Sequence, residues 1–154
     1  MKKIIFISFL IFCITLKSQS LHVYDFIKVY KIKTLEEKSD FLYKEKFTKD
    51  DSFTQNGSSF IKKRFRGRTQ EFDLEIIIIS NNQITYSLSE PKAFYNFKNM
   101  ISKIYQRNEQ ESNNIEIIYQ KDKKSDYKIK ITETNITFQD SKRNLFNFIC
   151  YPAK

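Results

Sequence analysis

The chain has 154 residues, of which 40% are hydrophobic and 16% aromatic, and its formal net charge is +9. This length suits one domain with a packed core, and the positive charge favours an anionic partner. With two Gly and two Pro, the chain has too few of either for long disordered or repetitive linkers.

Residues 1–20 have the order of a secretory signal peptide: a basic start, an uncharged apolar run over residues 4–16, and the closing segment KSQS. The apolar run is too short to span a bilayer, which needs ~20 residues. We expect cleavage after Ser20 or, equally, after Ser18. The sequence therefore predicts export to the periplasm or the extracellular space, with residues 21–154 as one mature domain without a transmembrane anchor.

Loss of the leader removes Lys2, Lys3 and Lys17, which lowers the formal net charge from +9 to +6. It also leaves one cysteine, Cys150, within the aromatic segment FNFICY. We expect a buried, inert thiol there, with an intermolecular disulfide as the alternative.

Two helices are predicted directly after the leader. Apolar residues between Val23 and Tyr30 recur at the spacing of one helical face. Thr34 and Glu37 then have the form of a capping box, which predicts a helix over residues 35–46.

The basic segment KKRFRGR (62–68) is predicted to form a hairpin with the acidic strand EFDLEIIII (71–79). Placing Phe65 opposite Phe72 sets each of three cations opposite an acid: Arg66 with Glu71, Arg64 with Asp73, and Lys62 with Glu75. Each such pair contributes about 0.2–1 kcal/mol, so the main effect is to fix the register.

The same register assigns a face to each apolar residue of the hairpin. The alternation predicts that Phe72, Leu74, Ile76 and Ile78 face the core. Ile77 and Ile79 would then point outward. The alternation in the later strand NIEIIYQ places Ile118 outward as well, and the three would form an apolar patch suited to a partner.

The rest of the chain repeats this pattern. A strand over residues 84–88 precedes a helix that Ser89 can cap and in which Pro91 suits the first turn, and further strands follow. Residues 35–88 and 91–151 both fit a helix followed by three strands, a degenerate tandem α-β-β-β repeat. We therefore predict an α+β fold with one antiparallel sheet of about six strands and helices packed on one face.

The leader ending in KSQS, the segment KTLEEKSDFL and the central helix PKAFYNFKNMISKIYQ resemble small exported proteins of unknown function from Bacteroidetes-type bacteria. The resemblance implies export and an α+β fold, and it implies no activity. The tandem arrangement is also similar to β-lactamase-inhibitor-like folds in architecture.

Residues suited to catalysis are few. The one histidine, His22, lies beside the expected mature N-terminus, and neither a zinc-ligand cluster nor a phosphate-binding loop is present. Asp73 and Glu75 share a strand face but have basic neighbours in the predicted register. We therefore assign no catalytic, cofactor-binding or metal-binding residue, and expect no cofactor.

Lysine and arginine residues beyond the three predicted pairs are expected to form an anion-binding surface, with a solvated hairpin tip as the alternative. Its members are Lys63, Arg68, Lys121, Lys123, Lys124, Lys128 and Lys130. We expect a non-enzymatic binding module whose partner is a protein or an envelope component. A carboxylate-dependent hydrolase and a binder of anionic envelope lipids or polysaccharide are the alternatives, and export disfavours nucleic acid.

Overall fold

The computed structural model describes residues 20–54, 56–65, 72–138 and 141–153. Its elements, in chain order, are α2 (Val23–Lys31), α3 (Leu35–Lys44), β1 (Thr48–Lys49), η1 (Asp51–Phe53), β2 (Ser58–Phe65), β3 (Phe72–Ile79), β4 (Ile84–Leu88), α4 (Pro91–Ile104), β5 (Gln106–Arg107), β6 (Ile117–Gln120), β7 (Tyr127–Phe138) and β8 (Ser141–Pro152). The remaining residues, including Arg66, Arg68 and Glu71 of the predicted hairpin, lie outside the described ranges.

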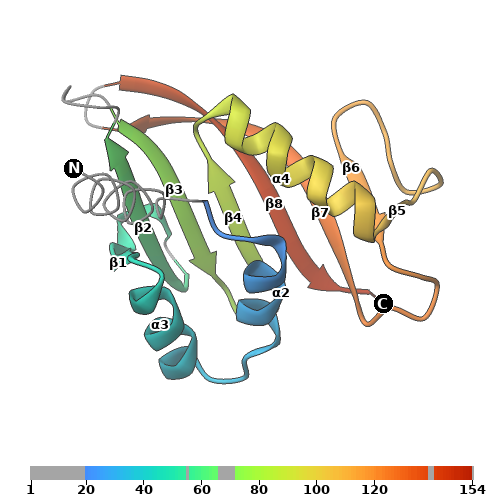
Figure 1. Ribbon diagram of the computed structural model, residues 1–154, viewed down its shortest axis with the longest axis horizontal. Coiled ribbons are helices and arrows are strands. Elements are labelled where there is room, and N and C mark those ends of the chain that lie inside the picture. Colours follow the sequence, from blue (N-terminus) through green and yellow to red (C-terminus); the bar gives the residue numbers. More distant parts are fainter. Residues whose placement is uncertain (1–19, 55, 66–71, 139–140, 154) are drawn as a thin grey trace, which may run out of the picture.

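The strands form one antiparallel sheet in the order β1-β2-β3-β4-β8-β7-β6-β5 (Figure 1). This confirms the α+β class with an antiparallel sheet. The prediction of about six strands was wrong, because the sheet of the described residues has eight. The two additional strands, β1 and β5, are two residues long and lie at the sheet edges, and so short a segment has no detectable alternation.

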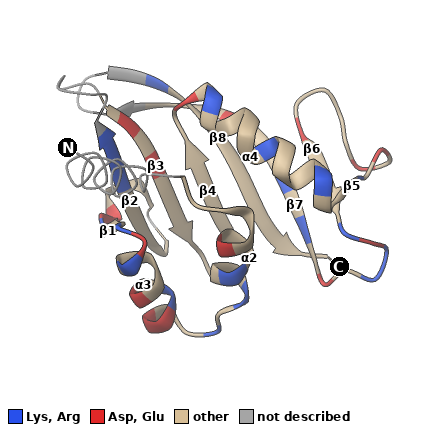
Figure 2. Cartoon of the chain, viewed as in Figure 1, with Lys and Arg blue, Asp and Glu red and all other residues tan. Residues whose placement is uncertain are grey.

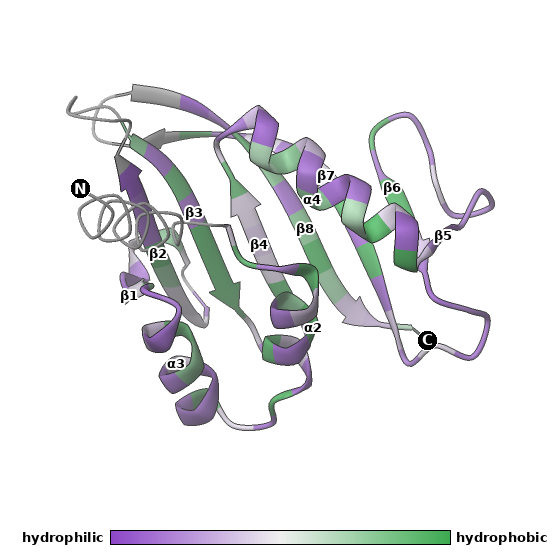
Figure 3. Cartoon of the chain, in the orientation of Figure 1, coloured by the Kyte–Doolittle hydropathy of each residue, from purple (hydrophilic) through white to green (hydrophobic). Residues whose placement is uncertain are grey.

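Three α-helices lie over the same face of the sheet, and the main core fills the space between the two layers (Figure 1). Helix α4 contributes Phe94, Phe97 and Ile101 to this core, at the spacing of one helical face. Strands β3 and β8 show long stretches of hydrophobic colour, whereas the helices carry many hydrophilic residues (Figure 3). Helices with one apolar face are therefore matched to the inner face of the sheet.

The predicted register of the β2–β3 hairpin is confirmed. Phe65 pairs with Phe72, Arg64 with Asp73, and Lys62 with Glu75. Opposite charges and apolar residues are therefore aligned across the two strands, as the alternation requires.

The face assigned to β3 was wrong. Ile77 and Ile79 are 0% and 7% exposed and belong to the core beneath the helices, so they form no outward patch. Because Asp73 and Glu75 lie on the same face as these isoleucines, the acids point toward the helices as well. The four consecutive isoleucines make both faces of β3 apolar at one end, and hydrophobicity alone therefore could not show which face was covered.

The other face of β3 packs in a second, smaller cluster. Its buried members are Ile61, Leu74, Ile76 and Leu145. The β7–β8 hairpin reaches this cluster: a terminal guanidinium nitrogen of Arg143 donates a 2.8 Å hydrogen bond to the backbone oxygen of Phe72 and the guanidinium lies over the Phe72 ring. Ile118 is not a member of the core beneath the helices, but it is only 6% exposed and presents no open apolar surface either.

Of the two helix caps predicted from the sequence, the one at Thr34 is present and the one at Ser89 is not. The Thr34 hydroxyl accepts a 3.3 Å hydrogen bond from the amide of Glu37 and donates one to its carboxylate. Helix α4 begins after Glu90, not after Ser89, whose hydroxyl instead accepts a 2.7 Å bond from the amide of Leu74. None of the helices in the described part of the chain is long and apolar enough to cross a membrane.

The corrected face of β3 can be tested by truncating Ile77 to alanine. Removal of a fully buried Ile side chain is expected to lower the free energy of unfolding by about 2–5 kcal/mol. Ile115→Ala is the control, because Ile115 is 83% exposed and its truncation should change stability by about 0.5 kcal/mol or less. Urea denaturation of both variants measures the difference, and equal small losses would contradict the assignment.

Candidate functional site

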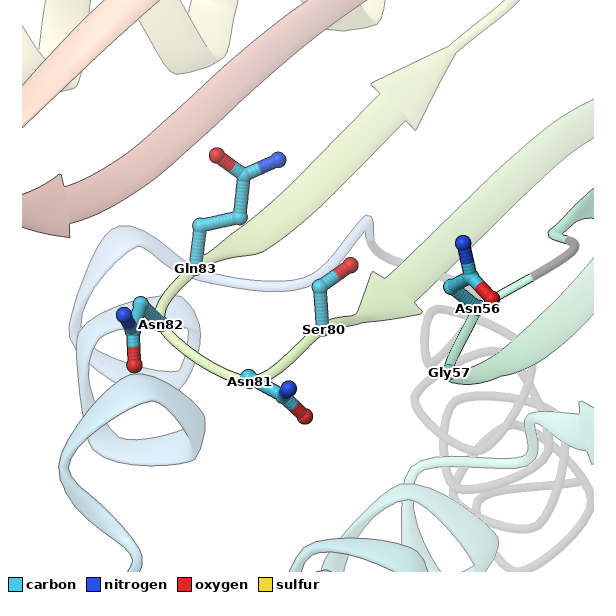
Figure 4. A pocket seen from close by; sticks show the side chains of 6 residues that line it. All are labelled: Asn56, Gly57, Ser80, Asn81, Asn82 and Gln83. Carbon is cyan, nitrogen blue, oxygen red and sulfur yellow. The ribbon is translucent and has the colours of Figure 1, made fainter.

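Amide side chains gather at the end of the sheet where β3 turns into β4 (Figure 4). They line a hollow of about 580 Å3, which we call the amide hollow. Its residues are Asn56, Gly57, Ser80, Asn81, Asn82 and Gln83. Two segments that are distant in sequence, the start of β2 and the β3–β4 turn, therefore meet at one surface.

A close backbone approach brings these two segments together. Gly57 has φ +138°, a conformation that side-chain-bearing residues rarely adopt. A Cβ atom at this position would lie 2.2 Å from the backbone oxygen of Ile79. Across the turn, the backbone amide of Ser80 donates a 3.0 Å hydrogen bond to the backbone oxygen of Gln83, which fixes the loop between β3 and β4.

The amide hollow offers donors and acceptors that the protein does not use. Asn56, Asn81, Asn82 and Gln83 are exposed, and within the described residues none of their side-chain amides forms a hydrogen bond. Each amide group can donate two hydrogen bonds and accept two. The surface is therefore uncharged but rich in free hydrogen-bonding groups.

A second hollow, of about 540 Å3, lies on the other side of the same turn. It shares Ser80–Gln83 with the amide hollow and is also lined by Tyr30, by one acid, Asp126, and by three lysines: Lys31, Lys33 and Lys38. Partial burial lowers the pKa of Lys38, because desolvation penalises its charged form. The β3–β4 turn therefore has amides on one side and, on the other, a hollow in which three lysines outnumber one acid.

Buried charges form a separate cluster, the Arg64 network, on the helix-covered face. Nε of Arg64 lies 2.7 Å from Oε1 of Glu75, and a terminal nitrogen of Arg64 lies 3.2 Å from Oε2 of Glu90. The Tyr86 hydroxyl donates a 2.7 Å hydrogen bond to Oε2 of Glu75. Glu75 has no exposed surface, so Arg64 and Tyr86 supply the partners that a buried carboxylate needs.

The chemistry of the Arg64 network differs from that of a carboxylate-dependent hydrolase. Such an enzyme holds two carboxyls across a cleft, one of them ready to donate a proton. Here Glu75 and Glu90 both contact the guanidinium of Arg64, so neither carboxyl is free of a basic partner. Burial and, next, the negative charge of Glu75 hold the pKa of Tyr86 well above its usual range, so its hydroxyl stays protonated.

The described residues of the predicted anion-binding surface belong to strands and a turn in different halves of the sheet, around β2 and around β7 (Figure 2). Lys63 is on β2, where its ammonium lies 5.2 Å from the centre of the Phe72 ring, and Arg68 lies outside the described residues. Lys128 and Lys130 on β7 form ion pairs with Glu111 and Glu116. Three exposed lysines remain together in the β6–β7 turn: Lys121, Lys123 and Lys124.

His22 and Cys150 have structural positions. The imidazole of His22 accepts a hydrogen bond of 3.4 Å from the amide of Tyr24 at the start of α2, and the side chain is exposed. Cys150 is fully buried, and burial raises the pKa of its thiol far above the usual range. The described part of the chain contains no group of three or more His, Cys, Asp or Glu residues that could hold a metal ion.

The sequence analysis missed both the amide hollow and the lysines beside it. The segment SNNQ (residues 80–83) connects β3 to β4, and a turn residue can also bind a ligand. The signal that could have drawn attention to it is the density of amides: three of four consecutive residues at 80–83, with another at Asn56. Their proximity depends on the β2–β3 register, which places Ser58 opposite Ile79.

The Arg64 network can be tested by the substitution Arg64→Met. This change leaves Glu75 buried without its ion partner and is expected to lower the free energy of unfolding by about 3–5 kcal/mol. Lys128→Met is the control, since its partner Glu111 is 42% exposed and the loss should stay below about 1 kcal/mol. Denaturant unfolding compares the two, and similar small losses would show that Glu75 has solvent or another partner.

Comparisons of the chain with models of protein families, with curated proteins and with solved structures found no match.

Proposed function

We propose that this protein is an exported, non-enzymatic binding module that recognises a hydroxyl-rich, acidic polymer of the cell envelope or the extracellular space. Binding takes place at the β3–β4 turn, in the amide hollow and against the adjacent lysines. The observation that carries the proposal is a set of four exposed amides, three in the β3–β4 turn and one beside it, that have no hydrogen-bond partner among the described residues.

Free amides favour a ligand with many hydroxyl groups. A sugar hydroxyl both donates and accepts hydrogen bonds, and so does a side-chain amide, so the two can pair in both directions. Each such neutral bond contributes about 0.5–1.5 kcal/mol, and several are needed for useful affinity. The amide hollow brings together Asn56, Asn81, Asn82 and Gln83 for this purpose.

The lysines beside the turn favour an acidic polymer over a neutral one. Lys31, Lys33 and Lys38 lie within one hollow that shares the turn with the amides. Cations placed together raise the local concentration of an anionic ligand and speed its association, with a strong dependence on salt. A polymer chain lying across the turn would contact both hollows at once.

The geometry gives less support to the other two candidate functions. A hydrolase would need carboxyls free of basic partners, whereas Arg64 contacts both Glu75 and Glu90. The lysines of the β6–β7 turn line neither of the two hollows, although Asp126 at the end of that turn lines the second one. They are a second, weaker candidate for anion binding.

Isothermal titration with oligogalacturonate, a sugar polymer with carboxylates, tests the proposal. The triple variant Asn81→Ala, Asn82→Ala, Gln83→Ala is expected to raise Kd about tenfold or more, because it removes three hydrogen-bonding groups. The double variant Lys31→Gln, Lys33→Gln is expected to weaken binding mainly at low salt. A neutral dextran should bind more weakly than the acidic polymer.

Two control variants make the test specific. Asn99→Ala removes an exposed amide on α4, and Lys123→Gln with Lys124→Gln removes the cations of the β6–β7 turn. Both should leave Kd within about twofold of the parent protein. Equal weakening by the triple amide variant and by Asn99→Ala would contradict the proposal, as would loss of binding through the β6–β7 lysines alone.

A further inference from the structure

The backbone at Leu21 is joined to the buried Arg64 network. The segment that leads into α2 crosses the helix-covered face of the sheet over β4 (Figure 1). The nitrogen of Leu21 donates a 3.1 Å hydrogen bond to the hydroxyl of Tyr86, which in turn donates to Oε2 of Glu75 at 2.7 Å. Leu21 is only 3% exposed, so its side chain fixes this nitrogen in place.

The Arg64 guanidinium is shared between two carboxylates. One guanidinium, that of Arg64, contacts two carboxylates, those of Glu75 and Glu90. Nε of Arg64 and Oε1 of Glu75 are both buried, and they lie 2.7 Å apart as an ion pair without a separate hydrogen-bond partner for either atom among the described residues. Because buried carboxylates are stabilised by charged donors, a cationic donor beside Tyr86 would stabilise the buried Glu75 further.

We propose that the Ser20–Leu21 peptide bond is the processing site of the leader, and that the α-ammonium of Leu21 then docks on Tyr86 and Glu75. Processing is a hydrolysis by a leader peptidase: water adds across the bond, Ser20 becomes the leaving carboxylate, and the amine of Leu21 takes a proton. A peptide nitrogen brings one hydrogen and no charge, whereas the ammonium brings three hydrogens and a positive charge.

The same geometry separates the two cleavage sites that the sequence leaves open. After cleavage behind Ser18, the free amino group would belong to Gln19, two residues and up to about 7 Å of extended chain from the nitrogen of Leu21. Position 21 would then keep its uncharged peptide nitrogen. Only cleavage after Ser20 delivers the ammonium to the Arg64 network.

The docked ammonium makes stability depend on pH in a defined direction. An α-amino group in an unfolded chain has a pKa near 8, and a carboxylate partner raises that pKa in the folded state. The stabilisation is therefore complete below about pH 8 and is lost as pH rises through the higher folded pKa. The charged or titratable groups around this nitrogen are Glu75, Tyr86, Arg64, Glu90, His22 and Lys92, the last four of which line an adjoining cavity of about 550 Å3.

The first arm of the test exports the full chain from a bacterial host and determines its N-terminus by mass spectrometry. We expect the exported protein to begin at Leu21. A protein that begins at Gln19, or that keeps Met1, would overturn the proposal.

The second arm compares chains that begin at Leu21 and at Gln19. Both contain every described helix and strand and both core clusters. At pH 6.5 the chain that begins at Leu21 should unfold at a Tm about 3–6 °C higher, and this difference should shrink above pH 9.

Tyr86→Phe and Glu75→Gln identify the partners of the ammonium. In either background the two chains should have Tm values within about 1 °C of each other, because the acceptor or its charge is gone. Tyr86→Phe preserves the packed ring and so keeps the comparison possible if Glu75→Gln fails to fold. Equal Tm values for the two chains without any substitution, or a difference that Tyr86→Phe leaves intact, would overturn the proposal.

Discussion

The burial of Glu75 on the helix-covered face is the constraint on which the rest of this structure depends. A carboxylate without exposed surface must have a cation and hydrogen-bond donors close by, because desolvation otherwise disfavours its charge. Arg64 and Tyr86 meet that need from the neighbouring strands β2 and β4. The pairing of β3 with both neighbours therefore has an electrostatic component in addition to the backbone hydrogen bonds of the sheet.

The same constraint connects distant parts of the chain. Glu90, at the start of α4, contacts the other side of the Arg64 guanidinium, and the backbone of Leu21 reaches the cluster through Tyr86. The chain segments that enter α2 and α4 are thus positioned by one group of side chains. At the opposite end of β3, the turn into β4 is free of such contacts, and its amides remain available to a ligand. One strand therefore connects a structural cluster at one end with the proposed binding surface at the other.

The sequence predicted local structure well where a single physical cause dominates. Apolar spacing predicts α2, the capping box of Thr34 and Glu37 predicts α3, and Pro91 suits the first turn of α4. The register of β2 with β3 follows from matching charges and apolar residues across the pair. Which face of β3 is covered could not be predicted in the same way. The run Ile76–Ile79 is apolar on both faces of the strand. A charged residue such as Glu75 normally predicts a solvent-facing position, so the sequence indicated the wrong face for the side that carries it.

The candidate sites were harder to predict than the fold. The amide hollow depends on a long-range approach at Gly57, where the backbone passes too close to Ile79 for a Cβ atom, and on the lysines of the α2–α3 segment. These contacts join segments that are distant in the sequence, so the spacing of residues within one segment does not predict them. The lysines of the predicted anion-binding surface were conspicuous in the sequence, but two of them, Lys128 and Lys130, are neutralised by carboxylates from the β5–β6 segment.

A double-mutant cycle between Arg64 and Glu75 tests the central claim most directly. The free energies of unfolding of the parent, Arg64→Met, Glu75→Gln and the double variant together give the coupling energy of the pair. The account predicts a coupling of about 2 kcal/mol or more, with the double variant more stable than the sum of the single losses implies. A coupling near zero would contradict it, because it would mean that Glu75 is not held in the core by Arg64.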